Sequence, residues 1–139
     1  RDSGVNIWEL TKRHIDGETE LIRLFDGIRD TAQKVRAALR GGAWDALGDI
    51  LAEAHPQRKL MSPNITTPQM DHLIDVATAN GAIAAKVCGA GGGGCIAFYC
   101  KDGFRSEVEA ALAGEDGSTV LDWSLNADGL TIETSYEES

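Results

Sequence analysis

The feature that most constrains the fold of this sequence is a glycine run at residues 89–94. It reads Gly-Ala-Gly-Gly-Gly-Gly and lies between two short apolar segments. Glycine has no Cβ, so such a loop can take positive φ angles and approach another backbone or a ligand closely. Before the run, Ile83, Ala85 and Val87 recur at the period of two that is typical of a strand. After it, the segment at 95–100 (C-I-A-F-Y-C) is β-rich and too short for a helix. The run is therefore predicted to join two strands.

The same run satisfies the pattern G-x-G-x-x-G at Gly89, Gly91 and Gly94, which occurs in dinucleotide-binding turns. In that fold the third glycine opens a helix whose N-terminus faces the pyrophosphate, and the sheet is parallel. An NAD-binding oxidoreductase would therefore need a helix that begins at Gly94. The β-rich segment that follows Gly94 argues against this function.

The glycine run and its flanks resemble the third sequence motif of the GHMP kinases, the family of galactokinase, homoserine kinase, mevalonate kinase and phosphomevalonate kinase. The likeness rests on Lys86-Val87-Cys88, on the run itself and Cys95, and on the apolar strand that follows. The segment from Leu60 to Asp71, then a helix and Asn80-Gly81-Ala82, is similar to the segment before that motif in the sugar-kinase branch, nearest to heptose-phosphate kinases and fucokinase-like enzymes. The resemblance is specific over residues 60–100, and more diffuse at residues 1–4 and around Trp8.

The resemblance implies the C-terminal domain of an ATP-dependent kinase that transfers the γ-phosphoryl group to a hydroxyl of a sugar or sugar phosphate, with Mg²⁺ neutralising the transferred charge. The family's motif P-x-x-x-G-L-G-S-S, which wraps the ATP phosphates, has no match here. We therefore expect residues 1–139 to be one domain whose partner is the N-terminal kinase domain of the same polypeptide. Alone it should hold no catalytic residue and no tightly bound cofactor, be inactive, and form a weak homodimer through the uncovered inter-domain surface.

The resemblance also implies the site. Its nucleotide and substrate cleft is expected at Gly89, Ala90, Gly91, Gly92, Gly93 and Gly94. Backbone N–H groups in such a loop can donate to anionic oxygens. Ser62, Asn64 and Thr66 are either substrate-side groups or ordinary turn and cap residues beside two prolines. Lys86 either reaches a phosphate or lies on the solvated face of its strand.

Composition and residue spacing argue against several other classes of function, namely nucleic-acid binding, membrane spanning and metal binding. The chain has 22 acidic and 13 basic residues, a formal charge of −9, so a nucleic-acid backbone would be repelled. No apolar run approaches the roughly 20 residues that span a membrane, and no targeting segment is visible. Cys88, Cys95 and Cys100 form no C-x-x-C pair, which favours free, mostly buried thiols in the cytoplasm. The spacing of His14, His55 and His72 predicts no metal site, and Asp71 with Asp75 is typical of a solvated helix face.

Apolar spacing and turn residues predict the remaining elements. A helix over residues 19–40 should bury one face and end at Gly41-Gly42, and its apolar positions are Leu21, Phe25, Ile28, Ala32, Val35 and Leu39. A second helix follows over residues 44–58 as an antiparallel partner, and a third begins at the cap Thr67 with Pro68 and ends at Asn80-Gly81. A fourth helix is predicted from the cap Asp102 to Gly114, and a hairpin over residues 121–125 and 130–132 completes the order.

These elements predict an α+β, two-layer, ferredoxin-like sandwich with a mostly antiparallel sheet and helices on one face. Domains of this class also bind small molecules without catalysing a reaction. A stand-alone ligand-binding or regulatory module is therefore the alternative to a kinase domain. An upstream domain with the phosphate-wrapping motif would decide for the kinase.

Overall fold

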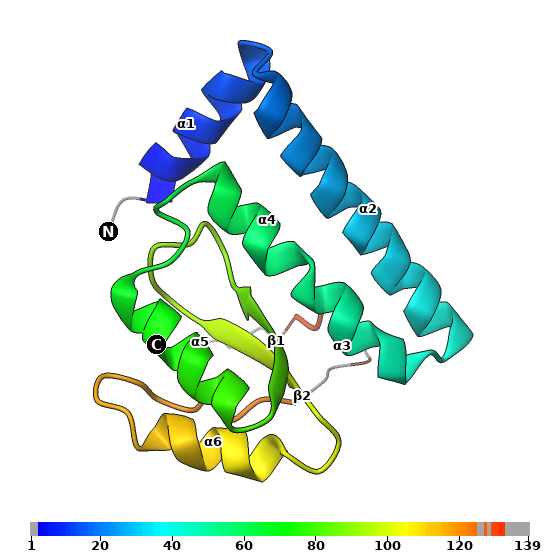
Figure 1. The fold of residues 1–139 in the computed structure, drawn as a ribbon, viewed down its shortest axis with the longest axis vertical. Helices are drawn as coiled ribbons and strands as arrows, with labels where there is room; N and C mark the ends of the chain where they lie inside the picture. The colour runs from blue at the N-terminus through cyan, green and yellow to red at the C-terminus, as the bar shows by residue number, and fades with distance from the viewer. Residues whose placement is uncertain (1–2, 125–126, 128, 133–139) are drawn as a thin grey trace, which may run out of the picture.

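The structure is a computed structural model that describes residues 3–124, 127 and 129–132. Its elements in chain order are α1 (Ser3–Ile15), α2 (Thr19–Gly41), α3 (Trp44–Ala52), α4 (Ala54–Met61), α5 (Pro68–Ala79), β1 (Ala82–Val87), β2 (Ile96–Cys100) and α6 (Arg105–Ala113) (Figure 1). The two strands are antiparallel neighbours. The predicted α+β class with an antiparallel sheet is confirmed.

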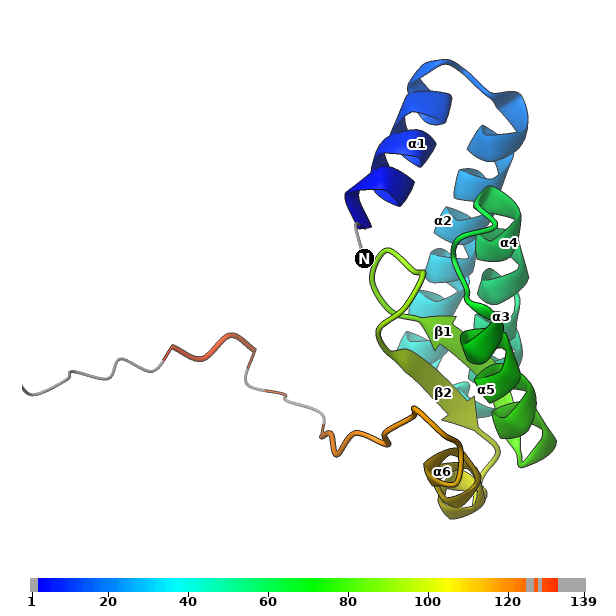
Figure 2. The ribbon, with the colours of Figure 1, turned by 90° about the vertical axis from the view of Figure 1, so that its left-hand side faces the viewer.

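Helices α3, α4 and α5 lie along one side of the strand pair. Helices α3, α4 and α5 contact β1, and α2 packs along both α3 and α4, as Figures 1 and 2 show. Helix α6 packs on α5, where buried Ala77, Ala82 and Val108 form a small core with Phe98 and Cys100 against it. The predicted antiparallel pairing of the helix over residues 19–40, now α2, with the helical segment after Gly42 is correct.

The buried stripe of α2 differs by one position from the predicted face. Leu21 is fully buried as predicted, but Phe25 is 37% exposed and Leu39 is 46% exposed. The helix buries Thr31 and Ala38, each one position before the predicted Ala32 and Leu39, and Ala32 is exposed. Thr31 is tolerated inside because its hydroxyl donates to the carbonyl of Gly27 over 2.9 Å. The spacing of apolar residues, which predicted the buried face, does not include threonine. It therefore assigned the neighbouring apolar positions to the core.

The predicted helix over residues 44–58 is divided into α3 and α4 at Glu53. Pro56 explains the division, because proline has no N–H to donate to the residue four positions earlier and its ring clashes with that carbonyl. That residue is Ala52, the last of α3. The segment still continues as α4 to Met61, beyond the predicted end.

The caps of two predicted helices are confirmed. Gly42 ends α2 in the left-handed region at φ 66°, and the Thr67 side chain accepts from the N–H of Met70 at the start of α5. The predicted cap of α6 is wrong: this helix follows Phe104, whose side chain makes no capping bond, because Gly103 at φ 80° turns the chain after Asp102. Helix α1 was not predicted as an element.

Strand β1 is less regular than its sequence pattern. Its register with β2 shifts between Ala82 and Ala84. Ala84 and Ala85, which follow the shift in regular register, are both buried, so the strict alternation predicted from Ile83 fails. Lys86 is exposed. An irregularity of this kind lets two consecutive residues oppose one partner, which no count of period two anticipates.

The predicted hairpin over residues 121–132 is not formed by those of its residues that the structure describes. Leu121, Trp123, Leu130 and Ile132 lie outside any strand and are 58%, 62%, 90% and 82% exposed, while 125, 126 and 128 fall outside the described residues. Figure 2 shows the described residues that follow α6 leading away from the body. An isolated hairpin is marginal without an apolar surface to cover. The described sheet therefore has two strands, not the four expected.

A membrane-spanning helix is not found among the described residues, because none of their helices is both long and apolar enough.

Candidate functional site

The glycine run forms the loop of the β1–β2 hairpin. The Cys88 N–H donates to the Cys95 carbonyl over 2.9 Å and closes the loop, and β2 follows at Ile96. Positive φ angles occur at Gly89 (71°), Gly91 (84°), Gly92 (74°), Gly93 (147°) and Gly94 (88°). Side chains with a Cβ rarely adopt this region, so the glycines are required by backbone shape. The loop joins two antiparallel strands as predicted, and the NAD-binding alternative is contradicted because no helix starts at Gly94.

The loop rests on the backbone of the segment between α4 and α5. The Gly92 N–H donates to the Ile65 carbonyl over 2.9 Å. A Cβ on Gly91 would lie 2.7 Å from that carbonyl oxygen and 2.9 Å from the Ile65 Cα, closer than real Cβ atoms approach. Close backbone contact therefore explains one glycine of the run, and it unites the two segments that the sequence analysis selected.

Arg58 holds the other end of the loop. Its guanidinium extends from α4 and donates to the carbonyl of Val87, the last residue of β1, and to the carbonyl of Gly89 over 2.9 Å. The sequence analysis gave Arg58 no role beyond the end of the helix predicted over residues 44–58. Nothing in the sequence identifies backbone carbonyls as its partners, because these belong to a loop distant in the chain.

The segment 62–66 is organised by its own hydrogen bonds. Ser62 is 3% exposed, its hydroxyl donates to Asn6 Oδ1 over 3.2 Å, and it accepts from the Asn64 N–H over 3.2 Å. Asn6 Nδ2 in turn donates to the Asn64 carbonyl over 3.3 Å. The Thr66 hydroxyl, on a residue 9% exposed, donates to Asp71 Oδ2 over 3.2 Å. Ser62 and Thr66 thus perform the turn chemistry given as one alternative, while Asn64 is exposed.

Asp71 was predicted to lie on a solvated helix face, but its carboxylate also binds side chains of two other segments. Lys59 Nζ lies 2.8 Å from Asp71 Oδ1, so the carboxylate joins α4, the 62–66 segment and α5. The hydrogen bond from Lys59 lowers the pKa of Asp71, and the bond from Thr66 adds to this. Nearby, burial lowers the pKa of His55, with Lys59 contributing. Asp75 is exposed, as predicted.

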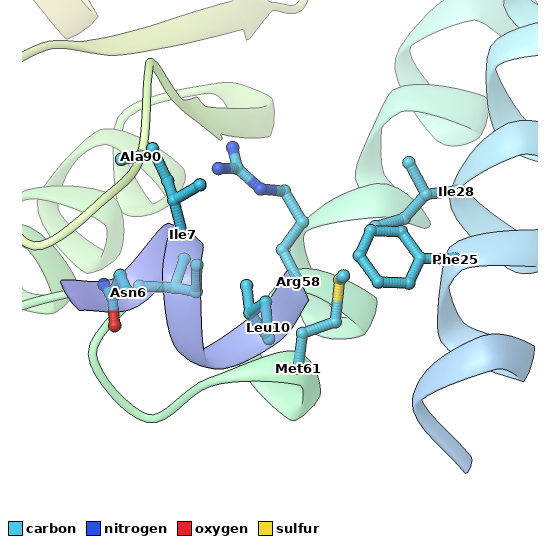
Figure 3. Close-up of a pocket in the computed structure, with 9 residues that line it drawn as sticks. Asn6, Ile7, Leu10, Phe25, Ile28, Arg58, Met61 and Ala90 are labelled. Carbon is cyan, nitrogen blue, oxygen red and sulfur yellow. The ribbon is translucent and has the colours of Figure 1, made fainter. Parts of the chain in front are cut away.

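An apolar cavity of about 300 Å³ lies beside the two loops (Figure 3). It is lined by residues of α1, α2, α4 and both loops, namely Asn6, Ile7, Leu10, Phe25, Ile28, Arg58, Met61, Ile65 and Ala90. Figure 3 shows Phe25 and Ile28 facing it from α2, and the Arg58 guanidinium reaching past it towards Ala90. The sequence analysis missed this cavity because helix α1, which contributes three of its lining residues, was not predicted.

The cysteines and histidines add no metal site among the described residues, where no three acidic, histidine or cysteine side chains meet. All three cysteines are free, but Cys95 is exposed and the other two are half-buried, so the prediction of mostly buried thiols is wrong. Burial raises the pKa of the Cys100 thiol. The loop position of Cys95, between the last glycine and β2, explains its exposure.

Comparison with known proteins identifies the family. A family model described as GHMP kinases C terminal matches residues 35–117. The chain is 26% identical over 114 residues to D-glycero-alpha-D-manno-heptose 7-phosphate kinase from Campylobacter jejuni, covering 82% of the chain and 33% of that protein. It is 33% identical over 106 residues to a mevalonate kinase from Thermococcus gammatolerans (76% and 28%), and 34% identical over 88 residues to a galactokinase from Streptomyces coelicolor (60% and 22%). The chain therefore spans a third or less of the length of these relatives. Because the family model covers more than half of the chain, this protein belongs to the GHMP kinases, and the matched region is their C-terminal domain.

Proposed function

We propose that this chain is the C-terminal domain of an ATP-dependent kinase that phosphorylates a hydroxyl of a sugar or sugar phosphate. The observation that carries the proposal is the contact between the glycine loop and Ile65, where Gly91 and Gly92 lie on the backbone of the polar segment. This contact brings the proposed nucleotide-side loop and the proposed acceptor-side segment together. The kinases named among the relatives support the reaction class.

In this proposal the loop Gly89–Gly94 forms one wall of a cleft whose other wall is an N-terminal domain of the same polypeptide. A Cβ built on Gly89, Gly93 or Gly94 would meet no heavy atom within 4 Å, so the backbone is open to an approaching ligand there. Main-chain N–H groups in such a loop can donate to phosphate oxygens and contribute to charge stabilisation. Asn64, which is exposed, is the substrate-side residue that the geometry favours.

ATP and Mg²⁺ fit this role only in part. The open glycine backbone suits phosphate oxygens, whereas no cluster of three acidic, histidine or cysteine side chains occurs in the described residues. We therefore assign the metal ligands to the other domain. Bound there, Mg²⁺ would neutralise charge on the phosphoryl group in transfer. Free thiols at all three cysteines suit a reducing compartment, and we propose the cytoplasm.

The test is phosphoryl transfer by the full-length protein, measured as ATP turnover with a heptose 7-phosphate, galactose and mevalonate as acceptors. We expect turnover with a sugar or sugar phosphate, and none above about 0.1 per second from residues 1–139 alone, because catalysis needs groups from both walls. Turnover by the 139-residue chain itself would contradict the proposal of a divided site. Ligand binding without turnover by the full-length protein would favour the non-catalytic module.

We also propose that the 139-residue chain alone associates weakly as a dimer through apolar surface that the other domain would cover. Helix α1 exposes Ile7 (55%) and Trp8 (66%), which a partner surface could bury. Analytical ultracentrifugation should show concentration-dependent sedimentation that Trp8→Asp abolishes. A strict monomer at millimolar concentration would contradict this expectation.

A further inference from the structure

The guanidinium of Arg58, which lies on helix α4, binds two peptide groups at the start of the glycine loop. It donates to the carbonyls of Val87 and Gly89, on either side of Cys88. In Figure 3 the side chain extends towards Ala90. A guanidinium is planar and presents its donors in a fixed fork, so it can hold two acceptors in one orientation.

The direction of these carbonyls decides the direction of the next two amides. In a trans peptide the C=O of one residue and the N–H of the next point in opposite directions. With the Val87 carbonyl turned to Arg58, the Cys88 N–H points to β2 and donates to Cys95 over 2.9 Å. With the Gly89 carbonyl turned to Arg58, the Ala90 N–H points away from that side chain. Within the part of the chain that the structure describes, the Ala90 N–H has no acceptor.

We propose that Arg58 is a positioning residue of the glycine loop, which holds the Gly89 carbonyl against α4 and thereby aims the Ala90 N–H at an anionic oxygen of the bound ligand. This inference rests on the proposed function, in which residues 89–94 face phosphate. Arg58 acts through the backbone and makes no contact with the ligand. The oxygen belongs either to the nucleotide or to a phosphorylated acceptor, which share this chemistry.

The test compares Arg58→Lys with Arg105→Lys in the full-length protein. Arg105 is a matched control because its side chain is 64% exposed and donates to Glu109 over 2.7 Å on the surface of α6. Lysine keeps the charge but lacks the fork that bridges two carbonyls. We expect Arg58→Lys to lower kcat/KM about tenfold while the protein stays folded, since the loss of an aimed donor costs about 100-fold or more where it is complete. Arg105→Lys should retain the wild-type value.

The substrate whose KM rises in Arg58→Lys identifies the ligand that supplies the anionic oxygen at the Ala90 N–H. A raised KM for MgATP assigns it to the nucleotide, and a raised KM for heptose 7-phosphate assigns it to the acceptor. Arg58→Ala should lower kcat/KM further than Arg58→Lys does. If the alanine variant does not fold, the lysine variant carries the comparison. Wild-type kcat and KM in Arg58→Lys would overturn the assignment.

A second measurement separates this inference from the proposed function. The Ala90 amide resonance should shift in Arg58→Lys and stay in place in Arg105→Lys, whether or not the protein turns over substrate. Adding inorganic phosphate should shift that resonance in the wild type and shift it less in Arg58→Lys. An inactive wild-type protein would refute the kinase proposal alone, whereas an Ala90 resonance that Arg58→Lys leaves unchanged would refute the role of Arg58.

Discussion

The main-chain N–H of Gly92 donates to the carbonyl of Ile65 over 2.9 Å, and this bond joins two loops that lie far apart in the sequence. Beside it, Gly91 touches the Ile65 backbone so closely that no Cβ fits. The relative position of the two loops is therefore fixed by main-chain contact. A kinase cleft built from both would depend on it.

Gly91→Ala should destabilise the protein more than Gly89→Ala. Both glycines have positive φ, at 84° and 71°, so alanine costs about 1–2 kcal/mol at either position through backbone strain. Only at Gly91 would the Cβ collide with the Ile65 carbonyl, at 2.7 Å, whereas at Gly89 it would meet nothing within 4 Å. Urea unfolding should show a free energy lower by about a further 1–3 kcal/mol for Gly91→Ala. Equal losses would mean that φ alone matters.

Thr67→Ala should cost about 1 kcal/mol of the free energy of unfolding. The Thr67 side chain accepts from the Met70 N–H over 3.2 Å and so satisfies a donor at the start of α5. Thr78 in the same helix is the control, because its hydroxyl donates to the Ile74 carbonyl over 2.7 Å inside the helix. Removing that bond should be neutral or slightly stabilising. Thr67→Ser should restore the wild-type value.

The Lys59–Asp71 pair should stabilise the protein at neutral pH and lose this effect in acid. The pKa of Asp71 is lowered below its ordinary 3.8, so its contribution is present above that value and is lost as the pH falls through the lower folded value. The side chains are 44% and 42% exposed, so we expect less than about 1 kcal/mol from a double-mutant cycle of Lys59→Met and Asp71→Asn. Molar salt should reduce the coupling energy. A coupling energy that changes neither with molar salt nor with falling pH would show that the interaction is not ionic.

His55 should reduce stability as the solution becomes mildly acidic. Burial lowers its pKa below the ordinary 6.5, so the unfolded chain takes up a proton that the folded protein does not, and the free energy of unfolding falls as the pH drops below that value. Above it the effect vanishes. His55→Gln should therefore lessen the fall in stability between about pH 7.5 and about pH 5.5, measured by urea unfolding. The same slope in both proteins would assign the fall to other groups.

Several elements could be predicted from the sequence because neighbouring residues decide them. Helix α2 with its Gly42 end, helix α5 with its Thr67 cap, and the strands around the glycine run are all determined by periodicity, capping and turn chemistry within a few residues. The division between α3 and α4 also has a local cause in Pro56, although the apolar spacing concealed it.

Only the tertiary structure decided which groups meet. A buried Thr31 in place of Ala32 depends on the helices that α2 packs against. The position of Arg58 beside the carbonyls of Val87 and Gly89 depends on how α4 lies on β1. The contact of Gly91 with Ile65 likewise joins segments whose own sequences say nothing of each other. The sequence alone determined that the glycine-rich run at residues 89–94 connects two strands. Backbone carbonyls are the same in every residue, so their choice as partners is visible only once the chain has folded.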